Sequence, residues 1–254
     1  MLQAERQEQI LEILRKDLTI RGSHLSEMLG VSEMTIRRDL DILKKQGLVD
    51  RTHGGAVFRQ ERLTEKFLHR NSIQENPGEK RRIAASASAM IEPNDTIYIG
   101  EGFTVAQVIR HVKPNIHFTI FTNNLGVISE MKDTVAELVL LPGTYDPATH
   151  ALAGPLTVEM IRQIHATKVF LGADSLSLSA GLTTANLEIA VVERSMIRHT
   201  RGKVIVIADY SKFGRVSEIS IAPLKYINML VTSRKIPDDF QREFELMGGQ
   251  VVIA

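Results

Sequence analysis

Cysteine is absent from this chain of 254 residues, so neither a disulfide nor a cysteine-ligated metal site can form. Long apolar runs are also lacking, because no stretch approaches the roughly 20 residues that a membrane helix needs. The N-terminal segment MLQAERQEQILEILRK carries a charge every few residues, which is not the pattern of a secretory signal peptide. We therefore expect a cytoplasmic protein without a membrane span.

A charge excess of either sign is lacking as well, since the formal net charge is +1 at pH 7. Up to Phe58 the chain has nine Lys or Arg and nine Asp or Glu residues, which cancel. Any basic patch must therefore arise from the arrangement of the charges and not from their sum. The hydrophobic fraction of 43% and the charged fraction of 24% are those of an ordinary globular chain, long enough for more than one domain.

The N-terminal region has the pattern of three short helices and a hairpin. Apolar residues at helical spacing predict a first helix near 6–15. Ser23 is expected to cap a second helix, which Gly30 ends. Ser32 is expected to cap a third helix, with Gly47 as its C-terminal stop. The segment LVDRTHGGAV then predicts two short extended runs about a turn.

Helix, tight turn, helix and hairpin, in this order, outline a winged helix-turn-helix. If Ile36, Leu40 and Leu43 face a small core, the polar side chains of the third helix face away from it. Near the N-terminus of a recognition helix, arginine can pair with guanine, and threonine or methionine can touch a thymine methyl. Basic residues farther along the helix and in the hairpin can meet phosphates. The expected DNA-binding residues are Ser32, Met34, Thr35, Arg37, Arg38, Lys44, Arg51 and His53.

A simpler explanation of the polar face of the third helix is that it is only solvated surface. Arg37 lies four residues before Asp41, and the two could form an ion pair. The ordered set of turn, capped helix, glycine stop and basic hairpin favours DNA binding instead. A protein that only bends DNA would not need the large domain that follows.

The segment TIRRDLDILKKQGLVDRTHGGAV resembles the signature of the DeoR family of bacterial transcriptional regulators. The family pattern is Val-Ser-x-x-Thr-Ile-Arg-Arg-Asp-Leu, a glycine, and then Arg-x-His-Gly-Gly, and every one of these positions is matched between Val31 and Gly55. The resemblance implies sequence-specific repression of a sugar-metabolism operon. The helix would then read double-stranded operator DNA, and the rest of the chain would control when it does.

The second part of the chain alternates short apolar runs with helical stretches. After a helix expected from Glu79 to about Ile91, the apolar runs are TIYIG, HFTIF, ELVLL, KVFLGA, KVIVIA, NMLVT and QVVIA. Alternating strands and helices predict an α/β domain with a mostly parallel sheet. We therefore predict a winged helix-turn-helix DNA-binding domain at 1–58, a linker at 59–78, and an α/β effector-sensing domain at 79–254.

Ligand sites of α/β sheets lie at the carboxyl ends of the strands, and three loops there carry polar groups. They are 100–104, 122–124 and 210–214. A glycine-rich turn before a helix offers backbone amides to an anion, and the other loops add a lysine and side-chain donors for sugar hydroxyls. The alternative is that these residues only form turns. The expected ligand-binding residues are Gly100, Glu101, Gly102, Phe103, Thr104, Thr122, Asn123, Asp174 and Lys212.

The resemblance extends through this second part, where the family has a sensor domain similar in fold to ribose-5-phosphate isomerase. It implies a sugar phosphate as effector. The chain departs from the family pattern at five positions: Gly100 replaces an aspartate, Phe103 a threonine, Pro142 a glycine, Asp146 an arginine and Glu193 a lysine. An acidic side chain that faces a phosphate weakens its binding. The expected effector is therefore a phosphorylated sugar, with a neutral sugar, or no ligand, as the alternative.

An enzyme is the rival class, in the form of a sugar-phosphate isomerase that carries a DNA-binding head. Asp174 and Glu188 are carboxylates that could act as its base. The phosphate-binding loop of kinases is absent, no residue spacing indicates a metal site, and no cofactor is expected. A DNA-binding regulator explains the N-terminal region better. Because one small head buries little DNA surface, we expect a homo-oligomer, either a dimer or a tetramer.

Overall fold

The computed structural model describes residues 6–7, 9–11, 13–14, 19–45, 49–52, 54–58, 77–131 and 134–254, without the side chains of residues 19, 45, 50, 51, 57 and 58. The chain divides into two compact units, which we call the head unit (Met1–Glu65) and the sensor unit (Lys66–Ala254). Each unit has a hydrophobic core of its own. The predicted linker at 59–78 lies outside the described residues, except for Pro77 and Gly78, which open a helix of the sensor unit, α5 (Pro77–Ser88).

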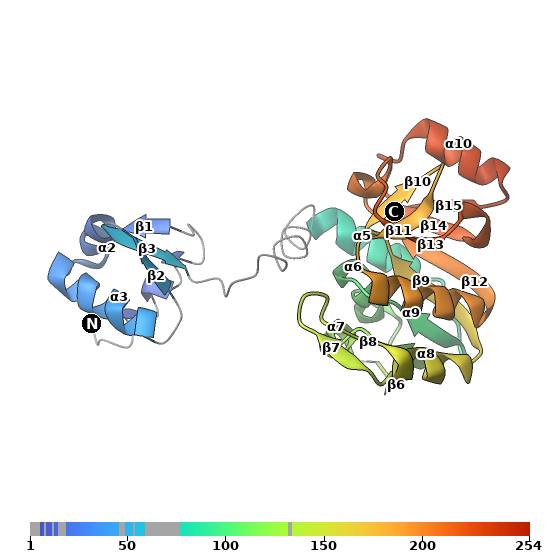
Figure 1. Ribbon diagram of the computed structural model, residues 1–254, viewed down its shortest axis with the longest axis horizontal. Coiled ribbons are helices and arrows are strands. Elements are labelled where there is room, and N and C mark those ends of the chain that lie inside the picture. Colours follow the sequence, from blue (N-terminus) through green and yellow to red (C-terminus); the bar gives the residue numbers. More distant parts are fainter. Residues whose placement is uncertain are drawn as a thin grey trace. The chain divides into compact units, whose positions relative to one another are not determined.

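The head unit contains the predicted helices and hairpin (Figure 1). The described residues between 6 and 14 are helical, and they are followed by α2 (Gly22–Leu29) and α3 (Glu33–Lys45). An antiparallel sheet in the order β1-β3-β2 completes the unit. Its strands are β1 (Thr19–Arg21), β2 (Val49–Thr52) and β3 (Gly55–Phe58). The sequence did not predict β1.

Two of the helix signals of the head unit, Gly30 and Ser32, are confirmed. Gly30 ends α2 in the left-handed conformation, with φ 63°. Ser32 caps α3, since its Oγ accepts a hydrogen bond of 3.2 Å from the backbone N–H of Thr35. The prediction for Ser23 was wrong: α2 begins two residues earlier than this cap requires, and its N-cap is Arg21, which makes no side-chain cap bond. Gly47 lies outside the described residues.

A seven-stranded sheet forms the centre of the sensor unit, and all of its neighbouring strands are parallel. Its order is β15-β14-β12-β9-β4-β5-β6. The strands are β4 (Thr96–Ile99), β5 (Thr119–Thr122), β6 (Glu137–Leu140), β9 (Ala166–Gly172), β12 (Thr200–Ile207), β14 (Met229–Thr232) and β15 (Gln250–Ile253). Each overlaps one of the apolar runs of the sequence, so the predicted α/β class is confirmed.

Helices cover both faces of this sheet (Figure 1). One face packs against α5 (Pro77–Ser88), α6 (Phe103–Ala106), η1 (Ile109–His111) and α7 (Gly126–Glu130). The other packs against α8 (Pro155–Arg162), α9 (Leu187–Arg198) and α10 (Asp238–Leu246). Strand β4 shows the alternation, since Ile97 and Ile99 join one core and Tyr98 joins the other. Within the described ranges no helix is long and apolar enough to cross a membrane.

Two small antiparallel sheets were not predicted. One is a hairpin of β7 (Thr144–Asp146) and β8 (Ala151–Ala153). The other joins β10 (Ser175–Ser177), β11 (Gly181–Thr184) and β13 (Ile219–Ala222). Two short 3-10 helices, η2 (Tyr210–Lys212) and η3 (Leu224–Tyr226), complete the described elements.

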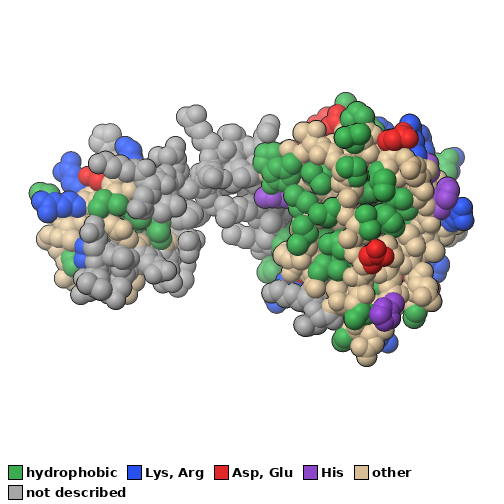
Figure 2. Space-filling model, turned by 90° about the horizontal axis from the view of Figure 1, so that it is seen from below, with side chains coloured by type: hydrophobic (Ala, Val, Ile, Leu, Met, Phe, Trp, Pro, Cys, Tyr) green, Lys and Arg blue, Asp and Glu red, His purple; other side chains and the backbone are tan. Residues whose placement is uncertain are grey.

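Apolar side chains also reach the surface of the sensor unit (Figure 2). Leu156 of α8 is 67% exposed and Leu187 of α9 is 57% exposed, and these two helices pack against each other and against β8. Tyr145 of β7 and Val191 of α9 are also exposed. Figure 2 shows apolar side chains gathered on one face of the sensor unit, and contiguous apolar surface is typical of protein–protein contacts.

Candidate functional site

The recognition helix α3 presents a polar face. Ile36, Leu40 and Leu43 are each 1% exposed and anchor the helix in the core of the head unit. On the opposite side Arg37, Arg38 and Lys44 are exposed, as is Met34. Neither Arg38 nor Lys44 has an ion-pair partner in the part of the chain that the structure describes, so both cations are available to an external anion.

A groove runs between α3 and the β2–β3 hairpin. Met34 and Arg37 line it from the helix, and Thr52 and Gly54 line it from the hairpin. The helix and the hairpin therefore present one continuous surface, as a winged helix-turn-helix requires for contact with DNA. The side chain of Arg51 and all of His53 lie outside the described residues.

Three polar residues of the signature segment have structural contacts. The hydroxyls of Ser32 and Thr35 lie 2.9 Å apart in a hydrogen bond that supplements the helix cap. Asp39 is 1% exposed, and its carboxylate pairs with Arg6 at 2.6 Å and accepts from Gln7 at 3.2 Å. Asp39 thus fixes α3 to the N-terminal helix, a role that the sequence alone did not indicate.

The paired glycines of the hairpin are explained by backbone geometry. Gly54 has φ 95°, which L side chains rarely adopt, and its carbonyl accepts a 2.8 Å hydrogen bond from the N–H of Gly22. A Cβ on Gly55 would collide with the carbonyl oxygen of Ile20 in the adjacent β1. Both positions therefore need glycine to bring the hairpin against β1.

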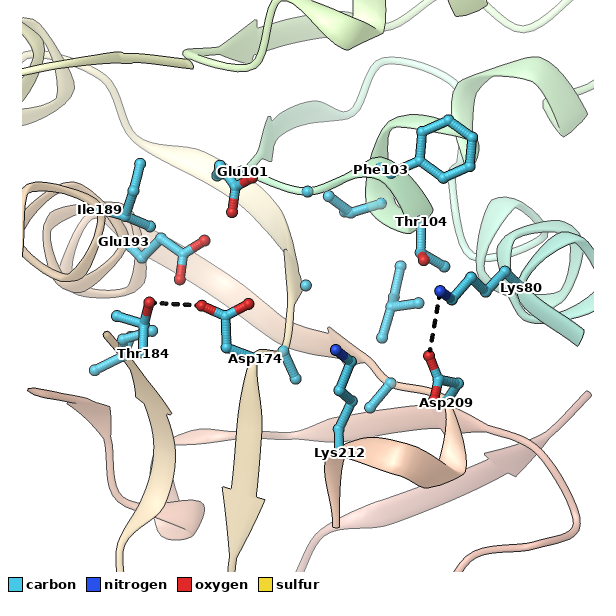
Figure 3. A pocket seen from close by; sticks show the side chains of 17 residues that line it. Lys80, Glu101, Phe103, Thr104, Asp174, Thr184, Ile189, Glu193, Asp209 and Lys212 are labelled. Carbon is cyan, nitrogen blue, oxygen red and sulfur yellow. Dashed lines mark hydrogen bonds and ion pairs between the residues drawn. The ribbon is translucent and has the colours of Figure 1, made fainter. Parts of the chain in front are cut away.

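The sensor unit has a small pocket, with a cavity volume of about 50 Å³, at the carboxyl ends of β4, β9 and β12 (Figure 3). Its lining residues are Lys80, Glu101, Gly102, Phe103, Thr104, Val105, Gly172, Ala173, Asp174, Thr184, Ile189, Glu193, Ile207, Ala208, Asp209, Lys212 and Ile221. The pocket therefore occupies the strand ends where ligands bind in open α/β sheets.

Six of the nine expected ligand-binding residues line the pocket: Glu101, Gly102, Phe103, Thr104, Asp174 and Lys212. Gly100, Thr122 and Asn123 do not line it. The Thr122 hydroxyl donates to the carbonyl of Ile99 at 2.7 Å, and the Asn123 amide donates to the carbonyl of Leu152 at 2.9 Å. Both side chains are fully buried, so these interactions hold the loops together and leave neither residue at the pocket surface.

Asn124 supports the loop after β4. Its amide nitrogen donates to the carbonyls of Gly100 and Gly102, at 3.1 and 2.9 Å. This loop leads into α6, which is a helix of only four residues. The sequence predicted an anion site at the N-terminus of this helix. Because α6 is so short, binding of an anion there would depend on the surrounding side chains.

One side of the pocket is basic, and we define it by Lys80, Thr104 and Lys212. Lys80 projects from α5, and its Nζ lies 3.7 Å from a carboxylate oxygen of Asp209. The half-buried Lys212 points into the middle of the pocket (Figure 3) and has no ion-pair partner among the described residues. The hydroxyl of Thr104 faces the same space. This side can receive an anionic group through charge-assisted hydrogen bonds.

The opposite side is acidic, and we define it by Glu101, Asp174 and Glu193 (Figure 3). Asp174 accepts a 2.6 Å hydrogen bond from the hydroxyl of Thr184. Burial raises the pKa of Glu193 well above its ordinary value, and the negative charges of Glu101 and Asp174 raise it further. A hydrogen bond with the backbone of Glu101 partly opposes this shift.

Gly100 and Glu193, two of the positions at which the chain departs from the family pattern, are neighbours in the fold. A Cβ on Gly100 would lie 2.9 Å from Glu193 Oε1 and 2.7 Å from a methyl group of Leu171. Glycine at position 100 therefore makes room for the buried carboxyl of Glu193. Asp146 does not face the pocket, because its carboxylate accepts from the backbone of Ala148 at 2.8 Å within its own turn.

Sequence reasoning assigned no role to four polar or charged lining residues: Lys80, Thr184, Glu193 and Asp209. Lys80 carried no signal, because it lies on a helix far from the strand-end loops in the sequence. Glu193 was noted only as a departure from the family pattern. Within the described ranges no group of three or more His, Asp or Glu side chains is placed to hold a metal ion.

Comparison with known proteins matches both units to one family. Residues 75–234 match the DeoR C terminal sensor domain, and residues 6–62 match the DeoR-like helix-turn-helix domain. The HTH-type transcriptional regulator GlpR of Haloferax volcanii is 32% identical over 99% of this chain and 98% of its own length. The HTH-type transcriptional regulator GolR of Listeria innocua is 31% identical over the whole of both chains.

The fold, the exposed helix and these matches define a DNA-binding transcriptional regulator with a small-molecule sensor domain. The chain belongs to the DeoR family of transcriptional regulators. Among solved structures, ribose 5-phosphate isomerase A of Methanocaldococcus jannaschii aligns with 55% of this chain and 55% of its own, at a TM-score of 0.40 and 17% identity.

Proposed function

We propose that this regulator represses a carbohydrate-metabolism operon and that a phosphorylated sugar, or a related small metabolite, bound in the pocket controls its operator binding. The observation that carries the proposal is the half-buried Lys212, which points into a pocket at the strand ends and has no ion-pair partner among the described residues. The Lactose phosphotransferase system repressor of Lactococcus lactis, 30% identical over 96% of each chain, supports a sugar-related role.

The basic side of the pocket would hold the phosphate. Lys212 and Lys80 supply cations and Thr104 supplies a hydroxyl, all directed into the same space. Asp174 would accept a hydrogen bond from a sugar hydroxyl, because only one of its oxygens is engaged by Thr184. The ligand would thus span the pocket from its basic to its acidic side.

The exposed face of α3 would read the operator. Arg37 and Arg38 are placed for base edges, with Met34 and Thr35 beside them. Lys44 is placed for a phosphate contact. Ser32 would contribute through the cap that it forms with Thr35. Arg51 and His53 remain predicted phosphate contacts of the hairpin.

Helix α5 would carry the signal. Among the described helices of the sensor unit it is the first in the chain, and it bears Lys80 inside the pocket. A phosphate that competes with Asp209 for Lys80 would change the contacts of α5. Ligand binding would then shift the population between arrangements of the paired heads that fit, or do not fit, the operator half-sites.

This proposal makes the chain a regulator and not an isomerase, since its relatives carry regulator names and an enzyme has no use for the head. It implies a homo-oligomer, a dimer or tetramer, because two heads match a repeated half-site and double the contact with DNA. It also places the protein in the cytoplasm with its operator. We keep 1–58, 59–78 and 79–254 as the proposed domain boundaries.

A gel-shift experiment tests the proposal. The DNA upstream of the gene, and DNA selected from random sequence, would be bound by the full chain with and without a panel of sugars and sugar phosphates. We expect specific binding that a phosphorylated sugar releases. A response only to unphosphorylated sugars would favour the neutral-sugar alternative, and a lack of specific DNA binding would contradict the regulator itself.

A further inference from the structure

The pocket is smaller than the class of ligand that is proposed for it. Its cavity volume of about 50 Å³ lies well below the roughly 300–1,000 Å³ that is typical of small-molecule sites. A sugar phosphate does not fit into such a volume with every wall in its present place. At least one wall of the pocket must therefore move when a ligand enters.

The first turn of α5, residues 77–80, is the wall best placed to move. It lines the pocket through Lys80, but the buried apolar residues of α5 begin only at Ile83. The other walls are the strand ends of the central sheet and the helices α6 and α9, which contribute residues to the two apolar cores. A terminal helical turn opens at a lower cost than elements packed in a core.

Two ion pairs hold this turn over the pocket. Lys80 lies 3.7 Å from Asp209, and Glu79 Oε2 lies 3.9 Å from Lys235 Nζ. Both distances exceed those of good hydrogen bonds. Glu79 is only 7% exposed, and its Oε1 has no hydrogen-bond partner among the described residues. Because a buried acceptor without a partner costs free energy, exposure of the turn to water would offset part of the cost of opening.

Lys235 joins this turn to the part of the pocket that carries Lys212. Besides its contact with Glu79, its Nζ lies 4.3 Å from the centre of the Tyr210 ring, a cation–π geometry. Tyr210 opens η2, the short helix whose last residue is Lys212. Lys235 thus bridges α5 and η2, although it does not itself line the pocket.

We propose that residues 77–80 form a gate that opens to admit the ligand, and that Glu79, Lys235 and Tyr210 form a latch that keeps it closed. This inference rests on the proposed function and adds the step by which the ligand enters. Since the ligand binds only the open form, its apparent affinity is reduced by the fraction of chains that are open. A weaker latch should therefore give tighter binding.

Hydrogen exchange of the full chain tests the latch without any ligand. Lys235→Met removes the charge and keeps a long side chain. The amides to follow are those of residues 81–83, whose helical hydrogen bonds close the first turn of α5. We expect them to exchange about three-fold faster in the variant, as for the loss of one partly exposed ion pair.

Lys225→Met is the matched control for this variant. Lys225 also lies over a tyrosine ring, with its Nζ 5.3 Å from the centre of Tyr226, but neither residue lines the pocket. Exchange of residues 81–83 should stay at the wild-type rate. Glu79→Gln should have the same effect as Lys235→Met, and the double variant should exchange no faster than either single variant, because both changes remove one contact.

Isothermal titration calorimetry with glucose 6-phosphate and galactose 6-phosphate tests the gate. A sugar phosphate that binds the wild type should bind Lys235→Met about three-fold more tightly and Lys225→Met equally well. Equal affinity of wild type and Lys235→Met would overturn the inference, because the turn would then move without opening the pocket.

Unchanged exchange of residues 81–83 in Lys235→Met would overturn the inference whether or not any sugar phosphate binds. Full additivity of Glu79→Gln and Lys235→Met would also overturn it, since the two residues would then act separately. Gel shifts separate these failures from failure of the proposed function. If exchange and affinity change as expected while operator binding responds to no sugar phosphate, the gate stands and the effector control of operator binding is rejected.

Discussion

Lys80 Nζ lies 3.7 Å from Asp209 Oδ2, and both side chains are only 4% exposed. The pair joins α5 to the end of β12 at the wall of the pocket. Burial makes such a pair sensitive to the loss of one partner, since the remaining charge is left without compensation. It also makes Lys80 the residue through which an anionic ligand can act on α5.

Replacement of one partner should therefore destabilise the sensor unit. We expect Lys80→Met to lower the free energy of unfolding by about 3 kcal/mol, because it leaves Asp209 buried and unpaired. The double variant Lys80→Met/Asp209→Asn should recover part of this loss. Urea denaturation of the full chain measures both. The control is Arg162→Met, which removes an ion pair with Glu159 in which both side chains are 62% exposed, and should change stability by less than about 1 kcal/mol.

If Lys80→Met is as mild as Arg162→Met, the buried pair contributes nothing to the stability of the sensor unit. The role of Lys80 as a link between ligand and α5 would then have no structural basis.

The arginines of α3 should determine operator affinity. We expect Arg37→Ala or Arg38→Ala to cost roughly 1–3 kcal/mol on operator DNA, because a base-contacting arginine contributes that much. Lys44→Ala should weaken specific and nonspecific DNA alike and reduce the salt dependence of binding. Fluorescence anisotropy over a range of salt concentrations measures both effects.

Arg201→Ala, an exposed position on β12 of the sensor unit, provides the control for these variants. It should bind operator like the unmodified chain. If both arginine variants of α3 bind operator with wild-type affinity, α3 is not the recognition helix.

Self-association should use the apolar surface of the sensor unit. Leu156 and Leu187 are exposed on neighbouring helices, and a second copy of the chain would bury them. We expect a dimer or tetramer by light scattering at micromolar concentration. Leu187→Glu should shift it toward the monomer and weaken operator binding, because paired heads are lost.

Leu246→Glu is the matched control, since Leu246 is 74% exposed at the end of α10. A monomeric wild-type chain that still binds operator tightly would contradict the prediction. A Leu187→Glu variant that keeps the wild-type mass would place the contact elsewhere on the protein.

Glu193 should make stability depend on pH. Its pKa is raised in the folded state, so the folded chain retains a proton that the unfolded chain has already released above its ordinary pKa of 4.5. Stability therefore falls as the pH rises from that value through the raised pKa, by at most about 1.4 kcal/mol per pH unit for one group. Glu193→Gln should lose this contribution.

Thermal unfolding between pH 5 and pH 8 compares the two chains. The variant should show the smaller decrease in stability toward high pH, while the exposed Glu188→Gln keeps the wild-type slope. Parallel slopes for wild type and Glu193→Gln would show that the carboxyl of Glu193 does not retain its proton in the fold.

The sequence predicted the central sheet well, because parallel strands buried on both faces are continuous apolar runs. It did not predict short strands such as β10, whose sequence Ser175–Ser177 has too few residues for a recognisable period. A pocket lies at the strand ends where the sequence predicts a ligand site, and that position follows from the topology of the sheet.

The individual pocket residues were harder to predict for two physical reasons. A polar residue after a strand looks the same in the sequence whether it faces a ligand or bonds to the backbone, as Thr122 does. Lys80 is brought to the pocket by the packing of α5 against the sheet, and nothing in the local sequence records that contact.

The central claim is that a phosphorylated ligand in this pocket controls operator binding, and Lys212 tests it most directly. The measurement is operator affinity of the full chain during titration with the sugar phosphates of the panel, for wild type and for Lys212→Ala. We predict equal operator affinity without ligand and a response in the wild type alone, because the variant loses the unpaired cation of the pocket. A normal response in Lys212→Ala, or a wild type that responds only to unphosphorylated sugars, would contradict the account.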